Sequence, residues 1–308
     1  MKETFGQKTR RSHKRNQRVV MFWCAFVFAF VIAGVWLFRG TLFQNDSGAS
    51  SSGTNQSRHD ACGTADSRQK STDVTQAPMD HEVCQKLQDL VSQDQRVQQV
   101  IDNCEIYPED ILKMLSRNLD MLNFVLEYPE KVGQVFAETV GEVEGGEVPL
   151  LLQYDQRWGY GDYGNSSVAV SGCGPACLSM VITSLTGDDT ITPYVVAQYA
   201  SEQGYYVPGA GTAWTLMSEG AKHFGVIGEE LPLTKSIMEG VLKEGRPIIC
   251  SMRPGDFTTT GHFIVLAGMK DGKICVHDPN SKKRSEKLWD YETLESQINN
   301  LWSFTTLF

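Results

Sequence analysis

One stretch of the chain decides how the rest is interpreted: Ser171-Gly172-Cys173-Gly174-Pro175-Ala176-Cys177. An apolar run with helical character follows it, and a proline suits the first turn of a helix because its missing N–H would be unpaired there. We therefore expect Cys173 to lie at a helix N-terminus, where free N–H groups and the helix dipole favour a thiolate. The flanking glycines are expected to leave room for the backbone of a substrate.

A cysteine in this position has two interpretations. It is a candidate nucleophile if its thiolate is accessible, and it is a structural residue on a glycine-rich turn if it is buried, because most lone cysteines are inert. Cys173 and Cys177 also have the spacing of two metal ligands. No second Cys or His pair with zinc spacing accompanies them, so we expect no metal and no cofactor.

The charge of the chain is unevenly distributed. The 308 residues carry a formal net charge of −9, yet eight of the 28 Lys and Arg residues and only one of the 37 acidic residues precede residue 40. The remainder therefore has 20 basic and 36 acidic residues, a net charge of −16. Such an acidic body repels nucleic acid, so we expect no nucleic-acid partner.

A predicted membrane span explains the basic N-terminus. Residues 19–38 (VVMFWCAFVFAFVIAGVWLF) contain no charge, and about 20 apolar residues cross a bilayer. Six basic residues between positions 8 and 18 precede the run and only Arg39 follows closely. The tail of residues 1–18 is therefore predicted in the cytoplasm, with a single-pass anchor and an extracellular body. A cleaved signal peptide is the alternative, but the run is long for one and no clear small-x-small site follows.

Two segments separate the span from the C-terminal half. Residues 39–80 are rich in Ser, Thr, Gly, Asn, Asp and Gln, which is the composition of a flexible linker. Residues 81–143 repeat apolar residues at three- and four-residue steps, which predicts a small helical module. Tyr-Pro-Glu occurs at 107–109 and again at 128–130, and each proline is expected to begin a helix. No residue pattern in the module indicates catalysis, so we expect it to be a spacer or a docking unit.

An exported body could also hold disulfide bonds. Cys84 and Cys104 are the most suggestive pair, although spacing does not establish connectivity. Residues 148–308 then form a predicted second domain. Its expected helices are 174–186, 192–204, 211–224 and 234–244, and its expected strands are 247–252, 262–267, 273–278 and 301–308. Helices followed by an antiparallel sheet define the α+β class.

Cysteine catalysis needs a base and a third group that orients the base. His262 begins an apolar strand after a polar loop, and residues 270–273 mark a hairpin to the next strand. With a three-residue loop, Asn280 falls opposite His262 and Asp278 lies one diagonal away on the same face. A two-residue loop puts His277 on that face instead. Asp278 suits the chemistry best because a carboxylate accepts the imidazole N–H, and Asn280 is the second choice.

Three segments in this order, GCGPAC, GHFIVLAG and HDPN, resemble the papain-like cysteine peptidases of family thirty-nine, the bacteriocin-processing enzymes that cut double-glycine leaders. The resemblance covers about residues 148–308 and is closest to the stand-alone exported "peptidase-like" relatives, which lack a transporter. It implies a papain-like fold and a peptide substrate. It also implies Cys173 as the nucleophile, His262 as the base and Asp278 as the orienting residue, and the step of 16 residues between the last two fits the family.

One position departs from the family pattern. The bacteriocin-processing enzymes carry a glutamine six residues before the cysteine as oxyanion donor, where this chain has Ser167. Gln153 or Tyr163 is the candidate substitute, beside the backbone N–H of Cys173. The chain is thus predicted to be a membrane-anchored, extracellular bacterial thiol protease. Two alternatives stay open: a hydrolase of cell-wall peptidoglycan (an amidase or endopeptidase), and a catalytically silent peptide-binding module.

Overall fold

Residues 80–307 are described by the structure, which is a computed structural model. The predicted tail (1–18), the predicted membrane anchor (19–38) and the predicted linker (39–80, apart from Asp80) lie outside the described residues. Within residues 80–307, no helix is both long enough and apolar enough to cross a membrane. The described residues belong to one unit, which begins at Asp73.

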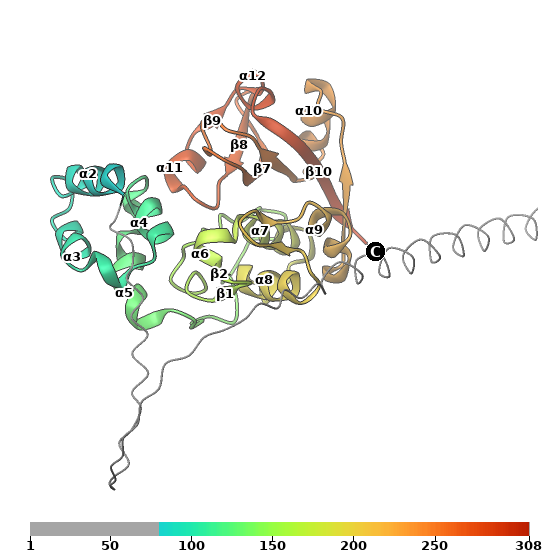
Figure 1. The fold of residues 1–308 in the computed structure, drawn as a ribbon. Coiled ribbons are helices and arrows are strands. Elements are labelled where there is room, and N and C mark those ends of the chain that lie inside the picture. Colours follow the sequence, from blue (N-terminus) through green and yellow to red (C-terminus); the bar gives the residue numbers. More distant parts are fainter. Residues whose placement is uncertain (1–79, 308) are drawn as a thin grey trace, which may run out of the picture. The chain divides into compact units, whose positions relative to one another are not determined.

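Short helices make up the first part of the described chain, drawn in cyan to green in Figure 1. They are α2 (His81–Leu90), α3 (Val97–Asp102), η1 (Cys104–Ile106), α4 (Glu109–Leu115), η2 (Leu119–Met121) and α5 (Leu122–Lys131). We call residues 81–131 the helical module. Its apolar faces share one hydrophobic cluster with Tyr154, Tyr160 and Ala169, and the ring of Phe124 stacks on that of Tyr160 with centroids 4.3 Å apart. The module is therefore packed against the chain that follows it.

The two Tyr-Pro-Glu copies do not play the same role. Pro108 is the N-cap residue of α4, as predicted. Pro129 lies inside α5, so the prediction that it begins a helix is wrong. Four buried side chains between Leu122 and Tyr128 hold one face of α5 in the core, and this packing offsets the i→i−4 hydrogen bond that Pro129 cannot donate; the helix ends two residues later, at Lys131. Cys84 and Cys104 are free thiols in the structure and not a disulfide.

A six-stranded antiparallel sheet forms the framework of the second part (Figure 1). Its strands are β5 (Val226–Glu230), β6 (Ile248–Met252), β7 (His262–Lys270), β8 (Lys273–His277), β9 (Leu288–Trp289) and β10 (Ile298–Thr306). Their order across the sheet is β5-β10-β6-β7-β8-β9. Two small hairpins, β1 (Asp162–Tyr163) with β2 (Ser166–Ser167) and β3 (Tyr206–Val207) with β4 (Gly211–Thr212), lie outside it. The predicted α+β class is confirmed.

Helices cover both faces of this sheet. One face packs against α7 (Cys173–Thr186) and α9 (Thr215–Ser218), and α8 (Pro193–Glu202) packs on α7; the other face packs against α10 (Lys235–Lys243) and α12 (Tyr291–Glu295). The remaining short helices are α6 (Val168–Ser171), η3 (Gly220–Phe224) and α11 (Lys282–Ser285). Phe263 and Val265 of β7 belong to the first core, whereas Ile264 and Leu266 belong to the second. Burial on both faces explains why the central strands are continuous apolar runs.

Two predicted elements differ from the structure. The helix expected over residues 211–224 is replaced by β4, α9 and η3. Gly211 has a φ of 82°, which an α-helix does not allow, and it pairs with Val207 in the β3–β4 hairpin. Strand β5 was not predicted. It is an edge strand whose Gly228 packs so closely that an added Cβ would lie 2.1 Å from the carbonyl oxygen of Met217.

The turn between β7 and β8 corrects another prediction. It has two residues and not three, because Asp271 (φ 52°) and Gly272 (φ 75°) both adopt the positive φ of a type I′ turn. An Asp-Gly pair is well suited to such a turn. Lys270 therefore pairs with Lys273, one residue out of the predicted register.

A β-bulge restores the predicted register next to the candidate base. It inserts one residue into β7 between Leu266 and Gly268, and Val265 consequently pairs with His277. Because side chains alternate along a strand, this pairing puts the residue after His277 on the same face as His262. The predicted neighbourhood of His262 thus results from two deviations that compensate each other.

Candidate active site

One cleft contains most of the side chains that the sequence analysis selects. It has a volume of about 1090 Å³, and Cys173, His262, Gln153 and Asn280 all line it. Helix α7 begins at this cleft and β7 begins there too. The site is therefore built where a helix N-terminus meets the end of the sheet.

Close packing of two glycines fixes Cys173, which is the first residue of α7 and is partly exposed. A Cβ at Gly172 would lie 2.4 Å from the carbonyl oxygen of Val168, and one at Gly174 would lie 2.7 Å from Oγ1 of Thr212. Both glycines are thus required by contacts within the protein. We expected them to leave room for a substrate, and the structure gives them this different role.

The surroundings of Cys173 favour its thiolate. Burial raises the pKa of the thiol, but the hydrogen bond and positive charge of His262, together with the backbone N–H groups of Phe263 and Gly174, outweigh it and lower the pKa below its ordinary value. The N-terminal end of the α7 dipole acts in the same direction. Cys173 is therefore chemically distinct from an ordinary buried thiol.

His262 is held between the thiol and a carboxylate. It is the first residue of β7 and is 8% exposed. Its Nε2 lies 2.8 Å from Oδ1 of Asp278, and since an ionised carboxylate only accepts, Nε2–H donates and Nδ1 is left for Cys173. Burial lowers the pKa of His262, but Asp278 and Cys173 raise it to about 10. The imidazole is therefore held as an imidazolium at neutral pH.

Asp278 follows β8 directly and is fully buried. Besides the bond from His262, its Oδ1 accepts the backbone N–H of Asn280 at 2.8 Å, and its Oδ2 accepts Nε–H of Arg284. Burial raises the pKa of Asp278, but the charges of His262 and Arg284 and their hydrogen bonds lower it below its ordinary value. Both oxygens thus have charged partners, which keeps the carboxylate ionised.

Arg284 is the site residue that the sequence analysis missed. It lies on the single turn α11, where the side chain of Ser281 accepts its backbone N–H at 3.2 Å and Trp289 donates its indole N–H to its carbonyl at 3.1 Å. A four-residue helix is too short to show periodicity, so the N-cap serine was the one available signal. With Arg284 included, the net charge of the site is zero, because the thiolate of Cys173 and the carboxylate of Asp278 balance the imidazolium of His262 and the guanidinium of Arg284. This balance reduces the cost of burying the ions.

The two predicted oxyanion donors lie in different places. Gln153 lines the cleft, its Nε2 donates to the carbonyl of Ala169 at 2.6 Å, and its Oε1 has no hydrogen-bond partner among the described residues. Tyr163 is fully buried outside the cleft lining, where its hydroxyl shares a 2.8 Å hydrogen bond with Oγ1 of Thr212. Ser167 is also buried away from the lining. Of these residues, Gln153 is the one that lines the same cleft as Cys173.

Two further candidates are brought near the site without touching His262. Asn280 lines the cleft, but within residues 80–307 its Oδ1 has no hydrogen-bond partner, and its backbone carbonyl accepts Nδ2–H of Asn118 at 3.0 Å. His277 is half-buried at the end of β8 with its Nδ1 unpartnered in the described structure, and the burial lowers its pKa. Asp278 is thus the residue bonded to the imidazole.

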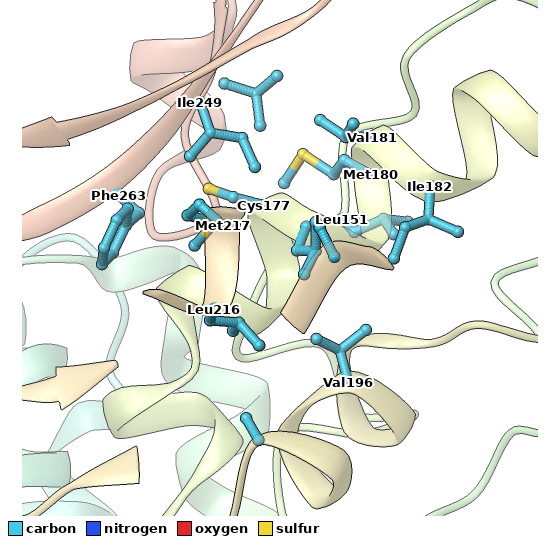
Figure 2. Close-up of a cluster of buried hydrophobic side chains, with 14 of the residues drawn as sticks. Leu151, Cys177, Met180, Val181, Ile182, Val196, Leu216, Met217, Ile249 and Phe263 are labelled. Carbon is cyan, nitrogen blue, oxygen red and sulfur yellow. The ribbon is translucent and has the colours of Figure 1, made fainter. Parts of the chain in front are cut away.

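Cys177 lies one turn along α7 and is fully buried. Figure 2 shows its sulfur in the hydrophobic core near Met217 and Ile249, and Phe263 belongs to the same cluster. Burial, the largest cause, and the nearby charge of Cys173 raise the pKa of Cys177 well above its ordinary value. Among the described residues, no group of three or more His, Cys, Asp or Glu side chains could hold a metal ion.

An α+β fold with a thiol and an imidazole in one cleft is an arrangement that cysteine peptidases have. A model of the Peptidase_C39 like family matches residues 146–306, just over half of the chain, and the chain therefore belongs to that family. The resemblance carried by GCGPAC, GHFIVLAG and HDPN is confirmed.

Solved structures and curated proteins give a weaker comparison. The chain is similar to the peptidase domain of Streptococcus ComA, described as a bi-functional ABC transporter involved in a quorum-sensing pathway, with 18% identity, a TM-score of 0.36, and coverage of 44% of this chain and 92% of that one. It is also similar to a Bacillus anthracis protein described as a C39-like peptidase, with 13% identity, a TM-score of 0.31, and coverage of 51% and 94%. No curated protein matches the chain.

Proposed function

We propose that this protein is a cysteine peptidase in which Cys173, His262 and Asp278 carry out the reaction. The observation that carries the proposal is the line of contacts from the thiol through the imidazole to a buried carboxylate, where Cys173 and His262 line a cleft of about 1090 Å³. The pKa of Cys173 is lowered and that of His262 is raised. A thiolate–imidazolium pair is the resting state that cysteine catalysis requires.

The reaction would proceed in two halves. The Cys173 sulfur attacks the carbonyl carbon of the scissile amide, a C–S bond forms, and His262 gives its proton to the leaving nitrogen as the C–N bond breaks. Water then attacks the thioester carbon while His262 takes its proton; a C–O bond forms, the C–S bond breaks, and the acid product leaves with the Cys173 thiolate and the His262 imidazolium restored. The backbone N–H of Cys173 and the side-chain amide of Gln153 are the proposed donors to the oxyanion, because both residues line the cleft; Nε2–H of Gln153 would have to turn from the carbonyl of Ala169, to which it donates here.

We also propose that the peptidase is anchored in the cell membrane by residues 19–38 and acts outside the cell. The support is the uncharged run and its basic cytoplasmic flank in the sequence. Protease added to intact cells should then release a fragment that contains residue 150. A mature chain that begins near residue 40, recovered from the medium without added protease, would instead indicate a cleaved signal peptide.

The experiment for the catalytic proposal compares three full-length chains on a mixture of synthetic peptides: wild type, Cys173→Ala and His262→Ala. Cleavage by the wild type and none by Cys173→Ala supports a thiol peptidase, and mass spectrometry of the products gives the cut sites. Muropeptides released from purified cell walls, with all peptides left intact, would favour a peptidoglycan hydrolase. Absence of both products and of labelling by a peptidyl thiol probe would favour a silent binding module.

A further inference from the structure

The loop that follows β8 carries Asp278, and its backbone supplies one of the donors to that carboxylate. We call residues 278–281 the Asp278 loop. Oδ1 of Asp278 accepts hydrogen bonds from Nε2–H of His262 and from the backbone N–H of Asn280, both at 2.8 Å. The placement of the Asn280 backbone therefore affects the same oxygen that bonds the imidazole.

Two other segments hold this loop by its carbonyl groups. The carbonyl of Pro279 accepts the backbone N–H of Gln153 at 2.8 Å. The next carbonyl, that of Asn280, accepts Nδ2–H of Asn118 at 3.0 Å. Asn118 belongs to the helical module and lies 162 positions before Asn280 in the chain. A side chain of the module is therefore bonded directly to the loop that carries the buried carboxylate.

The two partners of the Asn118 amide determine its orientation. As the N-cap residue of η2, Asn118 accepts the backbone N–H of Asp120 with Oδ1 at 3.2 Å, while its Nδ2–H donates to Asn280. A backbone N–H cannot accept a hydrogen bond and a carbonyl cannot donate one, so the opposite orientation of the amide would lose both bonds. One side chain thus connects the cap of η2 to the Asp278 loop.

The backbone of Asn118 is itself held by the core. Leu115 at the end of α4 and Met121 at the end of η2 are fully buried, and both belong to the hydrophobic cluster that the module shares with Tyr154 and Tyr160. Close packing on both sides of Asn118 restricts its movement relative to the site. The region that the family model matches begins at residue 146, so this support for the loop comes from outside that region.

We propose that Asn118 is a positioning residue, which holds the backbone of Asn280 so that its N–H stays on Oδ1 of Asp278, and that the helical module is thereby a working part of the active site. The proposal rests on the proposed function, because it concerns the carboxylate that orients His262. Without the bond from Asn118, the loop gains freedom and Asp278 holds the imidazolium less firmly.

The loss should be visible at Cys173. Asp278 raises the pKa of His262, and the bond and charge of His262 lower the pKa of Cys173. A weaker hold on the imidazolium therefore moves the pKa of Cys173 up, toward its ordinary value. Since the thiolate is the reactive form, the acidic limb of its alkylation profile should move to higher pH.

The test is the change Asn118→Ser in the full-length chain. A serine hydroxyl still caps η2, but the side chain is too short to reach the carbonyl of Asn280 as well. We measure the rate of Cys173 alkylation by iodoacetamide from pH 3 to pH 9 by peptide mass spectrometry. The acidic limb should move up by about 0.5 to 1 pH unit, the size expected from one hydrogen bond. On any peptide that the wild type cleaves, kcat should fall about three- to tenfold, with KM within about twofold.

Asn123→Ser is the matched control, because it makes the same change in the same module. Asn123 is exposed, and its Oδ1 accepts Nη1–H of Arg96 at 2.9 Å, so this bond stays within the module. The control should keep the wild-type alkylation profile and the wild-type kcat.

The outcomes separate the two proposals. An unmoved limb in Asn118→Ser overturns the positioning role, even if stability and kcat fall, because those losses alone reflect a structural role. An equal shift in Asn123→Ser also overturns it. A shift confined to Asn118→Ser, in a chain whose wild type cleaves no peptide, would retain the positioning role and reject the peptidase. Cleavage by the wild type with no shift would do the reverse.

Discussion

Cys173 and Cys177 lie one helical turn apart on α7, and the surroundings of the two thiols shift their pKa values in opposite directions. Cys173 begins α7 at the cleft, with backbone N–H groups and an imidazole beside its sulfur. Cys177 lies in the core among Met217, Ile249 and Phe263, with no charge-stabilising partner there (Figure 2). The pKa of the first thiol is lowered and that of the second is raised well above its ordinary value.

This contrast shows what determines the chemistry of a cysteine. Both thiols experience burial, which raises the pKa in each case. Only Cys173 has donors and a positive charge that outweigh that effect, and they come from two elements, the start of α7 and the start of β7. Helix position alone would therefore not make Cys173 reactive.

The largest expected effect is the difference in reaction rate between the two thiols. Iodoacetamide at neutral pH should modify Cys173 at least about a thousandfold faster than Cys177, because each unit of pKa changes the thiolate fraction about tenfold and Cys177 must also wait for local unfolding. Peptide mapping by mass spectrometry after short exposure measures both rates. Selective modification of Cys177 in the folded chain would reverse the assignment.

The next effect concerns the carboxylate that holds the imidazolium. Asp278→Asn removes the charge that raises the pKa of His262. The acid form of His262 is lost as pH rises through its pKa, so the alkaline limb of kcat/KM, near pH 10 in the wild type, should move to lower pH. Turnover near neutral pH should fall by about 10- to 100-fold, because the base remains but loses its orientation.

Mapping kcat/KM from pH 5 to pH 11 checks that prediction. Asn280→Ala is the control, since its backbone N–H still donates to Asp278 while the alternative orienting side chain is gone. An unchanged alkaline limb in Asp278→Asn, with a shifted one in Asn280→Ala, would assign the orienting role to Asn280.

A smaller effect is expected from Arg284, which acts through Asp278. Arg284→Met removes a positive charge beside a buried carboxylate, and this raises the pKa of every acid nearby. Both limbs of the pH profile should therefore move to higher pH, and activity near neutral pH should fall about tenfold. Arg284→Lys should restore most of the profile, because it keeps the charge. If the methionine variant loses activity with no shift of either limb, Arg284 has a purely structural role.

Whether a contact in this site could be predicted depends on how close its two residues lie in the sequence. The start of α7 at Cys173 was predictable because a proline and an apolar run lie next to it in the sequence. The closeness of His262 and Asp278 was predictable from the alternation of side chains along a strand, although the predicted length of the turn between β7 and β8 was wrong. The two-residue Asp271-Gly272 turn and the bulge between Leu266 and Gly268 shift the pairing register of β7 and β8 in opposite directions.

Long-range contacts could not be predicted in the same way. The bond from Arg284 to Asp278 depends on a single helical turn, and the bond from Asn118 to Asn280 joins residues 162 positions apart. The role of the helical module in the cleft wall depends on tertiary packing around Tyr160 and Phe124, which has no counterpart in the periodicity of either segment. A segment without catalytic residue types can thus still line the cleft of the candidate site.

The smallest expected effect on turnover is that of Cys177→Ala, and it completes the comparison of the two thiols. The sulfur fills core space beside Ile249 and Phe263 and makes no contact that the proposed reaction uses. Removing it should lower the free energy of unfolding by about 1–2 kcal/mol through lost packing and a small cavity, while kcat/KM stays within about twofold of the wild type. Urea denaturation and peptide cleavage by the same preparation measure the two quantities. A loss of turnover comparable to that of Cys173→Ala, with stability unchanged, would show that Cys177 takes part in the reaction and that burial alone does not silence it.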